Sequence, residues 1–127
     1  MTLSRAERAV LIAQYAAGPA RLRGALAQVP AEALRWRPAP GEWSAHEVVC
    51  HCADSETNSY ARIRFLLAEA DPLIQGYDEE AWARTGRHTE SGRYTAEEWL
   101  RIYAEHLEGH ARQIEANVEH WRAAQAR

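Results

Sequence analysis

The feature that most constrains this chain is a pair of helix-start signals. Ser44-Ala-His-Glu47 and Thr95-Ala-Glu-Glu98 have the spacing of a capping box, in which the hydroxyl side chain and the glutamate each bond to the other's backbone N–H. The first predicts a helix over residues 44–70, because a proline follows directly after Asp71 and disfavours α geometry there. The second predicts a helix over residues 95–124.

Two further helices are expected from apolar spacing and capping. Residues 4–28 carry a helical apolar stripe, and Pro19 within them predicts a kink because proline lacks a backbone N–H and clashes with the preceding turn. Asp78 can cap a short helix over residues 79–84. The polar segment 85–94 contains two glycines and is typical of a loop.

Composition supports the same fold class. Alanine is the commonest residue, at 25 of 127, and alanine, arginine, leucine and glutamate all favour helix. A chain of 127 residues is long enough for one core and too short for two. We therefore expect a single all-α domain over residues 1–127, with three long helices and one short helix.

Charge and residue usage exclude several classes of function. The net charge of −3 gives no broad basic surface for nucleic acid, and no apolar run is long enough to span a membrane. All 15 cationic residues are arginine, which excludes a Schiff-base lysine or a lysine P-loop. Cys50 and Cys52 are too close in sequence for an ordinary disulfide and are expected to be small core residues. The charged N-terminal segment does not resemble a signal peptide, so a cytoplasmic location is expected.

Two histidines of the last helix are the most informative residues. His106 and His110 are four positions apart and therefore point from one face of the helix. We expect that face to be buried, because a surface face would not carry two tryptophans and two isoleucines. The residues that share it are Trp99, Ile102, Tyr103, Ile114, Asn117 and Trp121. Two adjacent buried imidazoles cannot both be cations, and a shared metal ion would solve that problem. A hydrogen-bonded core pair, or a chance surface pair, is the alternative.

The helix over residues 44–70 offers a third ligand. His51 lies on a polar stripe with five other side chains: Glu47, Asp54, Ser55, Asn58 and Arg62. Such a stripe is typical of an internal, water-accessible cavity. The other histidines, His46, His88 and His120, are expected to be solvated or at helix ends.

The chain resembles the DinB/YfiT-like superfamily of metal-binding helical bundles. The resemblance rests on four segments in the right order: 43–56 (WSAHEVVCHCADSE), 77–82 (YDEEAW), 88–92 (HTESG) and 103–114 (YAEHLEGHARQI). It implies a four-helix bundle with one divalent metal (zinc, nickel, iron or manganese) held by three histidines. Carried onto this sequence, those ligands are His51, His106 and His110.

One departure from the family pattern concerns the third helix. Members of the family have a long helix between the segments that resemble 77–82 and 88–92, and here those segments almost adjoin. Three long helices would leave an apolar side uncovered, and exposed apolar patches mark interfaces. We therefore expect a homodimer in which two chains complete each other's bundle.

The resemblance also implies a reaction class. The expected activity is a metal-dependent transfer of a low-molecular-weight thiol to a small electrophilic substrate, or its isomerisation. Four polar residues are candidates to orient the substrate: Glu47, Asn58, Arg62 and Tyr103. Two alternatives remain, a metal-containing stress-response or interaction module without turnover and a bundle whose histidine cluster only stabilises the fold.

Overall fold

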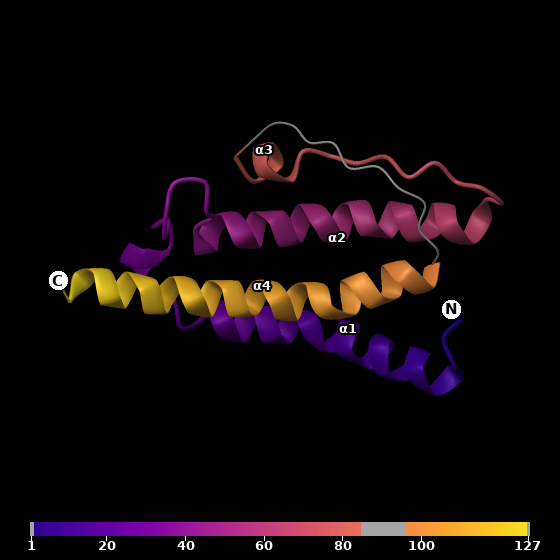
Figure 1. Cartoon of the computed structure of the whole chain (residues 1–127), viewed down its shortest axis with the longest axis horizontal. Helices are drawn as coiled ribbons and strands as arrows, with labels where there is room; N and C mark the ends of the chain where they lie inside the picture. Colours follow the sequence, from indigo (N-terminus) through magenta and orange to yellow (C-terminus); the bar gives the residue numbers. More distant parts are fainter. Residues whose placement is uncertain (1, 85–95, 127) are drawn as a thin grey trace.

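The computed structural model of the chain describes residues 2–84 and 96–126, and within these ranges it contains four α-helices and no strand (Figure 1). The helices are α1 (Arg5–Leu26), α2 (Ala45–Ala68), α3 (Glu79–Arg84) and α4 (Ala96–Gln125), and a 3₁₀ turn occupies Ala31–Ala33. The prediction of an all-α chain with three long helices and one short helix is confirmed.

Capping side chains fix the starts of these helices. Ser44 Oγ accepts a hydrogen bond from the backbone N–H of Glu47, and the Glu47 carboxylate accepts from the backbone N–H of Ser44 at 2.9 Å. Ser4 and Glu7 form the same box at the start of α1, which the sequence reading did not identify. Asp78 Oδ1 accepts from the N–H of Ala81 at 2.7 Å, as expected for the cap of α3.

Helix ends differ slightly from the prediction. Helix α2 ends at Ala68, two residues before the expected end, because Glu69 already has extended backbone angles ahead of the proline. Helix α1 likewise ends at Leu26 rather than at residue 28. The expected capping box at 95–98 and the expected loop at 85–94 include residues that lie outside the described part of the chain.

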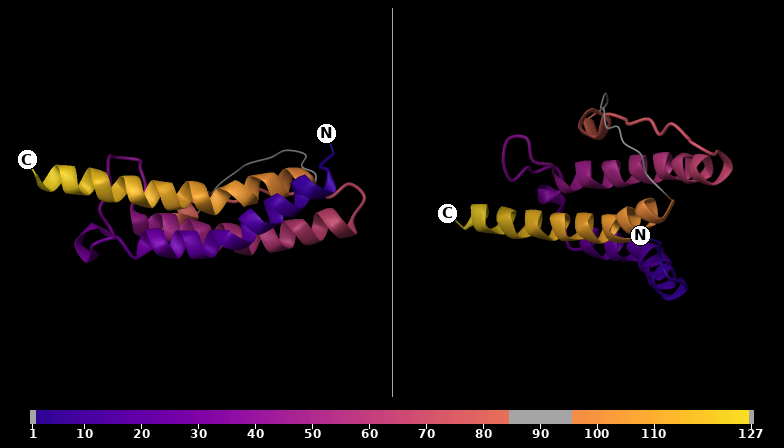
Figure 2. Two further views of the ribbon diagram at one scale, coloured as in Figure 1. Left: turned by 90° about the horizontal axis from the view of Figure 1, so that it is seen from below. Right: turned by 45° about the vertical axis from the view of Figure 1, so that its right-hand side comes forward.

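Helix α1 continues through Pro19 rather than ending there. In Figure 2 its indigo N-terminal part points in a different direction from its purple C-terminal part, in agreement with the expected bend within one helix. The preceding residue, Gly18, is buried against α4, where an added Cβ would lie 2.8 Å from Leu107 Cδ1. The absence of a side chain at Gly18 therefore lets α1 and α4 approach closely.

Helix α4 lies between α1 and α2 and packs against both, while α3 packs against α2 (Figures 1 and 2). Helices α2 and α4 run in opposite directions along their shared interface. The main core comprises seven buried residues: Ala25, Ala45, Val48, Cys52, Leu107, Ala111 and Ile114. Burying a side chain such as Ile114, which is fully inaccessible, contributes about 1.5–3 kcal/mol. The core therefore fixes α4 against α2 at the level of the histidines.

Not every residue on the expected buried face of α4 is buried. Tyr103, Ile114 and Asn117 are inaccessible, but Ile102 is 42% exposed. Each residue turns the helix by about 100°, so Ile102 points well away from Tyr103. In the described residues, no helix has the length and apolar character needed to cross a membrane.

Candidate metal centre

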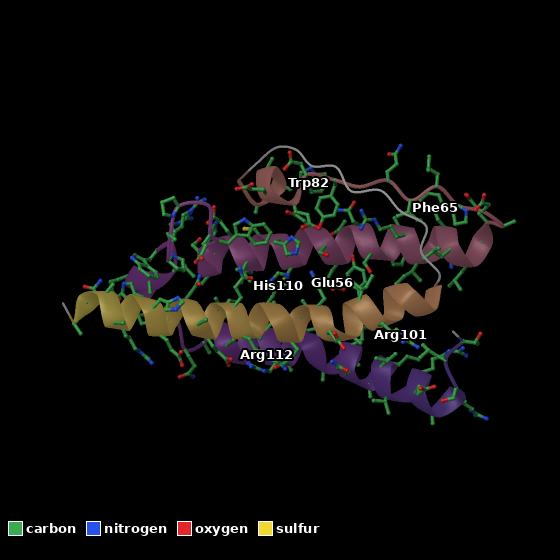
Figure 3. The ribbon with its side chains drawn as sticks, viewed as in Figure 1. Glu56, Phe65, Trp82, Arg101, His110 and Arg112 are labelled. Atoms are coloured by element: carbon green, nitrogen blue, oxygen red, sulfur yellow. The ribbon has the colours of Figure 1, made fainter. Side chains whose placement is uncertain are left out.

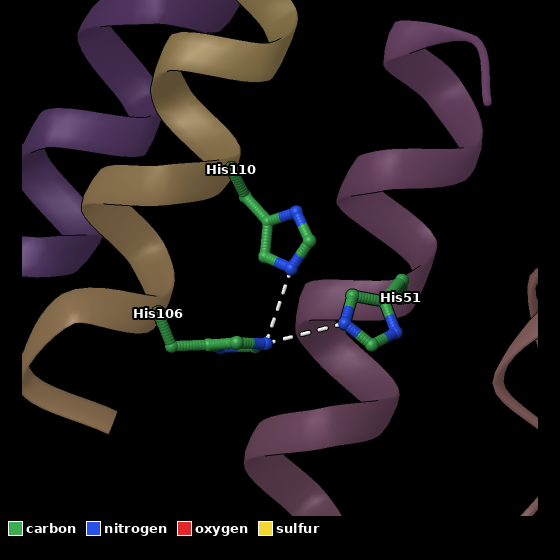
Figure 4. Close-up of side chains that lie close together, drawn as sticks. All are labelled: His51, His106 and His110. Carbon is green, nitrogen blue, oxygen red and sulfur yellow. Dashed lines mark hydrogen bonds between the residues drawn. The ribbon is translucent and has the colours of Figure 1, made fainter. Parts of the chain in front are cut away.

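Three histidines from two helices converge between α2 and α4; Figure 3 labels His110 there, and Figure 4 shows all three rings. His51 comes from α2, and His106 and His110 come from successive turns of α4. His51 Nε2 lies 3.2 Å from His106 Nε2, and His110 Nε2 lies 3.1 Å from the same His106 atom. The expected meeting of these three side chains is thus present in the structure.

The local fold explains why the rings meet. His106 and His110 are one helical turn apart, so both project from α4 toward α2. Val48 and Cys52 pack in the core beside His51 and hold that turn of α2 against α4. The planes of the three rings make angles of 66 to 87° with one another, and the ring centroids lie 4.5 to 5.3 Å apart.

The short nitrogen–nitrogen contacts cannot all be satisfied by hydrogen bonds. A neutral imidazole nitrogen carries either one hydrogen or one lone pair. His106 Nε2 faces two other ring nitrogens, so at most one of these contacts can be a hydrogen bond. In a tetrahedral metal site with bonds of about 2.0–2.1 Å, ligand nitrogens lie about 3.3 Å apart. His106 Nε2 lies close to this distance from the other two nitrogens, at 3.2 and 3.1 Å. The arrangement therefore fits a metal ion.

Burial keeps the three rings neutral. His51 is 3% exposed, and burial followed by the neighbouring imidazoles lowers its pKa to about 3. The same effects lower the pKa of His106 to about 4. Burial also lowers the pKa of His110, although its hydrogen bond to Gln113 acts in the opposite direction. Near pH 7 all three imidazoles have the protonation state that metal ligands require.

Aromatic and polar groups surround the histidines. The Trp43 ring lies 4.8 Å from the ring of His51 and stacks on His110 with an angle of 22° between the planes. One turn along, the Tyr103 ring lies 5.3 Å from that of His106, and its hydroxyl lies 3.3 Å from Ser55 Oγ. The rings are thus enclosed by an indole on one side and by hydroxyl groups on the other.

The four expected substrate-orienting residues are not brought together. Glu47 is bonded to Ser44 and ion-paired with Arg37 at the start of α2. Arg62 lies fifteen residues further along α2, about 22 Å along the axis, where it donates to Gln75 O at 2.8 Å. Glu47 and Arg62 share one side of α2 but lie far apart along its axis. They therefore cannot both face one small cavity.

The two remaining candidates differ in their surroundings. Asn58 Nδ2 donates to the backbone oxygen of Asp54 within its own helix, at 2.8 Å. Tyr103 is buried beside His106, so it is the candidate that the structure places next to the histidines.

Sequence reasoning missed Gln113 and the contacts of Trp43 with the histidine rings. Gln113 follows His110 by three positions, which is one helical turn, so this spacing could have indicated the contact. The position of Trp43 could not be read in the same way, because it depends on how the connector 27–44 folds back.

The other histidines and the cysteines lie outside this cluster. His46 Nε2 is 3.7 Å from Cys50 Sγ, and His120 is exposed near the end of α4. Cys52 is a buried free thiol whose pKa burial raises to about 12, in agreement with a core role. His88 lies outside the described residues.

Comparison with known families decides the relationship. The sequence profile of the DinB superfamily matches residues 14–79, just over half of the chain. The chain belongs to the DinB superfamily. The matched segment of this DinB protein contains His51 but ends before α4, so the structure supplies the link to His106 and His110.

Curated relatives share part of the sequence. A Bacillus licheniformis protein named a "putative metal-dependent hydrolase" is 42% identical over 65 residues, which cover 51% of this chain and 37% of that protein. YfiT of Bacillus subtilis, also named a "putative metal-dependent hydrolase", is 40% identical over 65 residues, covering 51% of this chain and 36% of YfiT. The DinB chain thus matches little more than a third of the length of these relatives.

A solved structure resembles nearly the whole chain. It is described as YfiT from Bacillus subtilis, a probable metal-dependent hydrolase with an unusual four-helix bundle topology. The superposition has a TM-score of 0.61 at 25% identity, and covers 98% of this DinB chain and 63% of the YfiT chain. The structural match to YfiT and the sequence match to the DinB superfamily therefore indicate the same relationship.

Proposed function

We propose that this DinB protein is a metal-dependent enzyme whose divalent metal is held by His51, His106 and His110. The observation that carries the proposal is the convergence of three Nε2 atoms, with contacts of 3.1 and 3.2 Å that hydrogen bonds cannot satisfy together. Because the imidazoles are neutral and aromatic groups enclose them, they are suited to bind zinc, nickel, iron or manganese.

Three protein ligands leave a coordination position open, which is the pattern of catalytic rather than structural sites. When bound, the metal would supply Lewis-acid chemistry, which lowers the pKa of a thiol or water and polarises a carbonyl. The chain contributes three buried or partly buried imidazoles, and Tyr103, whose ring lies 5.3 Å from that of His106, would orient a polar substrate group.

The proposed reaction joins a low-molecular-weight thiol to a small electrophile. Hydrolysis is the second candidate, because the relatives are named as metal-dependent hydrolases. The two reactions use different nucleophiles, a thiol or water, so a pair of assays can separate them. Turnover of 1-chloro-2,4-dinitrobenzene that requires added cysteine supports thiol transfer, whereas thiol-independent turnover of p-nitrophenyl acetate supports hydrolysis.

The decisive test of the proposal is metal content and stability of His110→Ala, with His120→Ala as a control on the same helix. We expect about one metal per chain in the wild type and in His120→Ala. In His110→Ala, metal and activity should be lost while the fold remains. If the metal is lost together with most of the stability, the site is structural. If the loaded wild type shows neither activity, a non-catalytic metal-containing module is supported.

The proposed assembly is a homodimer in which a second copy covers exposed apolar side chains. Val10 and Ile12 of α1 are 65% and 52% exposed, and Tyr60 and Leu67 of α2 are 73% and 70% exposed. YfiT has additional chain beyond the part that matches this protein. Light scattering at micromolar concentration should give twice the mass of the chain, and a well-folded monomer would contradict the proposal.

A further inference from the structure

The outward-facing nitrogens of the three histidines are not equivalent. His110 Nδ1 lies 2.8 Å from Gln113 Oε1. In contrast, His51 Nδ1 and His106 Nδ1 are buried and have no hydrogen-bond partner among the described residues. Within the part of the chain that the structure describes, His110 alone of the three has a side chain that bonds to its outer nitrogen.

That contact selects one tautomer of the ring. An amide oxygen only accepts, so the proton of a neutral His110 ring must lie on Nδ1. His110 Nε2 then keeps its lone pair, and this is the atom that faces His106 at 3.1 Å. A metal ligand needs that lone pair, and partners of the outer nitrogen commonly fix it.

Trp43 and Asn117 lie near Gln113 on the His110 side of α4. Gln113, Trp43 and Asn117 line a cavity of about 540 Å³. Asn117 Nδ2 donates to the backbone oxygen of Trp43 at 2.7 Å, and the Trp43 ring stacks on His110. The His110 ring is thus fixed by an indole at its face and by an amide at its outer edge.

From this geometry we propose that Gln113 is a positioning residue, which fixes His110 with Nε2 directed at the metal. The inference rests on the proposed function, since it assigns a role at the same metal site. It implies that His110 is the ligand prepared before metal binding, whereas His51 and His106 adopt their ligating tautomers when the metal binds.

The test measures zinc affinity by competition with a chromophoric chelator. We expect Gln113→Leu to weaken zinc binding by about 10- to 100-fold, as for other residues that support metal ligands. Gln113→Glu, whose carboxylate still accepts the hydrogen bond, should retain wild-type affinity or exceed it. Gln125→Leu changes an exposed glutamine of the same helix and should have no effect. Equal affinity of the wild type and Gln113→Leu would overturn the proposal.

A second readout needs no metal. Nitrogen-15 NMR of the metal-free chain reports which ring nitrogen of His110 carries the proton, and we expect Nδ1. A proton on Nε2 in the wild type would overturn the role of Gln113 even if Gln113→Leu does not fold. If the wild type binds no zinc, the proposed function fails, and the NMR result still decides whether Gln113 fixes the ring.

Discussion

The two faces of α4 use polar side chains in opposite ways. On the face toward α1, Arg21 donates to both carboxylate oxygens of Glu115, at 2.7 and 2.9 Å, and pairs with Glu108 at 3.0 Å. On the face toward α2, three neutral imidazoles meet and two of their outer nitrogens are buried without a partner among the described residues.

This contrast distinguishes polar groups that only hold helices together from polar groups that are arranged to bind a ligand. Charges at the α1–α4 interface satisfy one another and remain partly solvated, so they need no further ligand. The α2–α4 interface buries polar atoms whose contacts are incomplete, which is costly unless something else binds there. These polar atoms, unpartnered among the described residues, therefore point to the α2–α4 face as the one that binds a ligand.

The largest change in stability should come from lowering the pH, because this protonates the buried histidines between α2 and α4. The pKa values of His51 and His106 are about 3 and about 4 in the folded chain, below the unfolded value of about 6.5. Between these values the unfolded state binds more protons, so lowering the pH from 6.5 toward 4 destabilises the metal-free fold. The slope is at most about 1.4 kcal/mol per pH unit for each histidine.

Urea unfolding of chelator-treated protein at several pH values measures this slope. Replacing one buried ring, in His51→Leu, should flatten the pH dependence, whereas His120→Ala removes an exposed ring and should leave it unchanged. Identical slopes for the wild type and His51→Leu would show that the buried rings are not the source of the pH dependence.

A smaller effect is expected from Gly18→Ala on the opposite face. The new Cβ would lie 2.8 Å from Leu107 Cδ1 and 2.9 Å from Leu107 Cβ, so the buried leucine or the α1 backbone must move. Such overpacking costs about 1–3 kcal/mol, partly offset by the better helix propensity of alanine. Thermal unfolding checks the loss of stability, and metal content should not change.

Gly24→Ala is the matched control on the same helix. A Cβ at Gly24 meets nothing within 4 Å, so this variant should gain up to about 1 kcal/mol. If both glycine variants are equally stabilised, close packing of α1 on α4 does not require Gly18.

The smallest effect should come from Arg21→Ala. Its ion pairs lie at the surface, where solvent and salt weaken them. We expect the melting temperature to fall less than in Gly18→Ala, by an amount that shrinks as sodium chloride is added. A large, salt-independent loss would contradict the view that this face is only a solvated structural interface.

The sequence predicts the fold well because helix signals are local. Ser44 and Glu47 fix the start of α2 within four residues, and the proline after Asp71 limits its end to within two. The histidine pair on α4 is equally local, since residues four apart must share a face. The polar stripe on α2 and the family resemblance predict His51 as the third ligand, and the structure brings it to the same point.

The sequence could not predict which part of each helix lies next to the histidines. Helical spacing tells which way Glu47 and Arg62 point around α2, but not that only the middle of the helix faces the histidines. It likewise cannot show that Ile102 remains exposed, because burial requires a neighbouring segment on that side. Contacts made by the connector, such as the stacking of Trp43 on His110, depend on the packed structure.

The most direct test of the central claim is X-ray absorption spectroscopy of the zinc-loaded chain, because it reports the ligands themselves. The account predicts three imidazole ligands with zinc–nitrogen distances of about 2.0–2.1 Å and no sulfur ligand. His110→Ala should retain too little zinc to give this signature. A spectrum with zinc–sulfur scattering at about 2.3 Å, or with fewer than three imidazoles in the wild type, would contradict it.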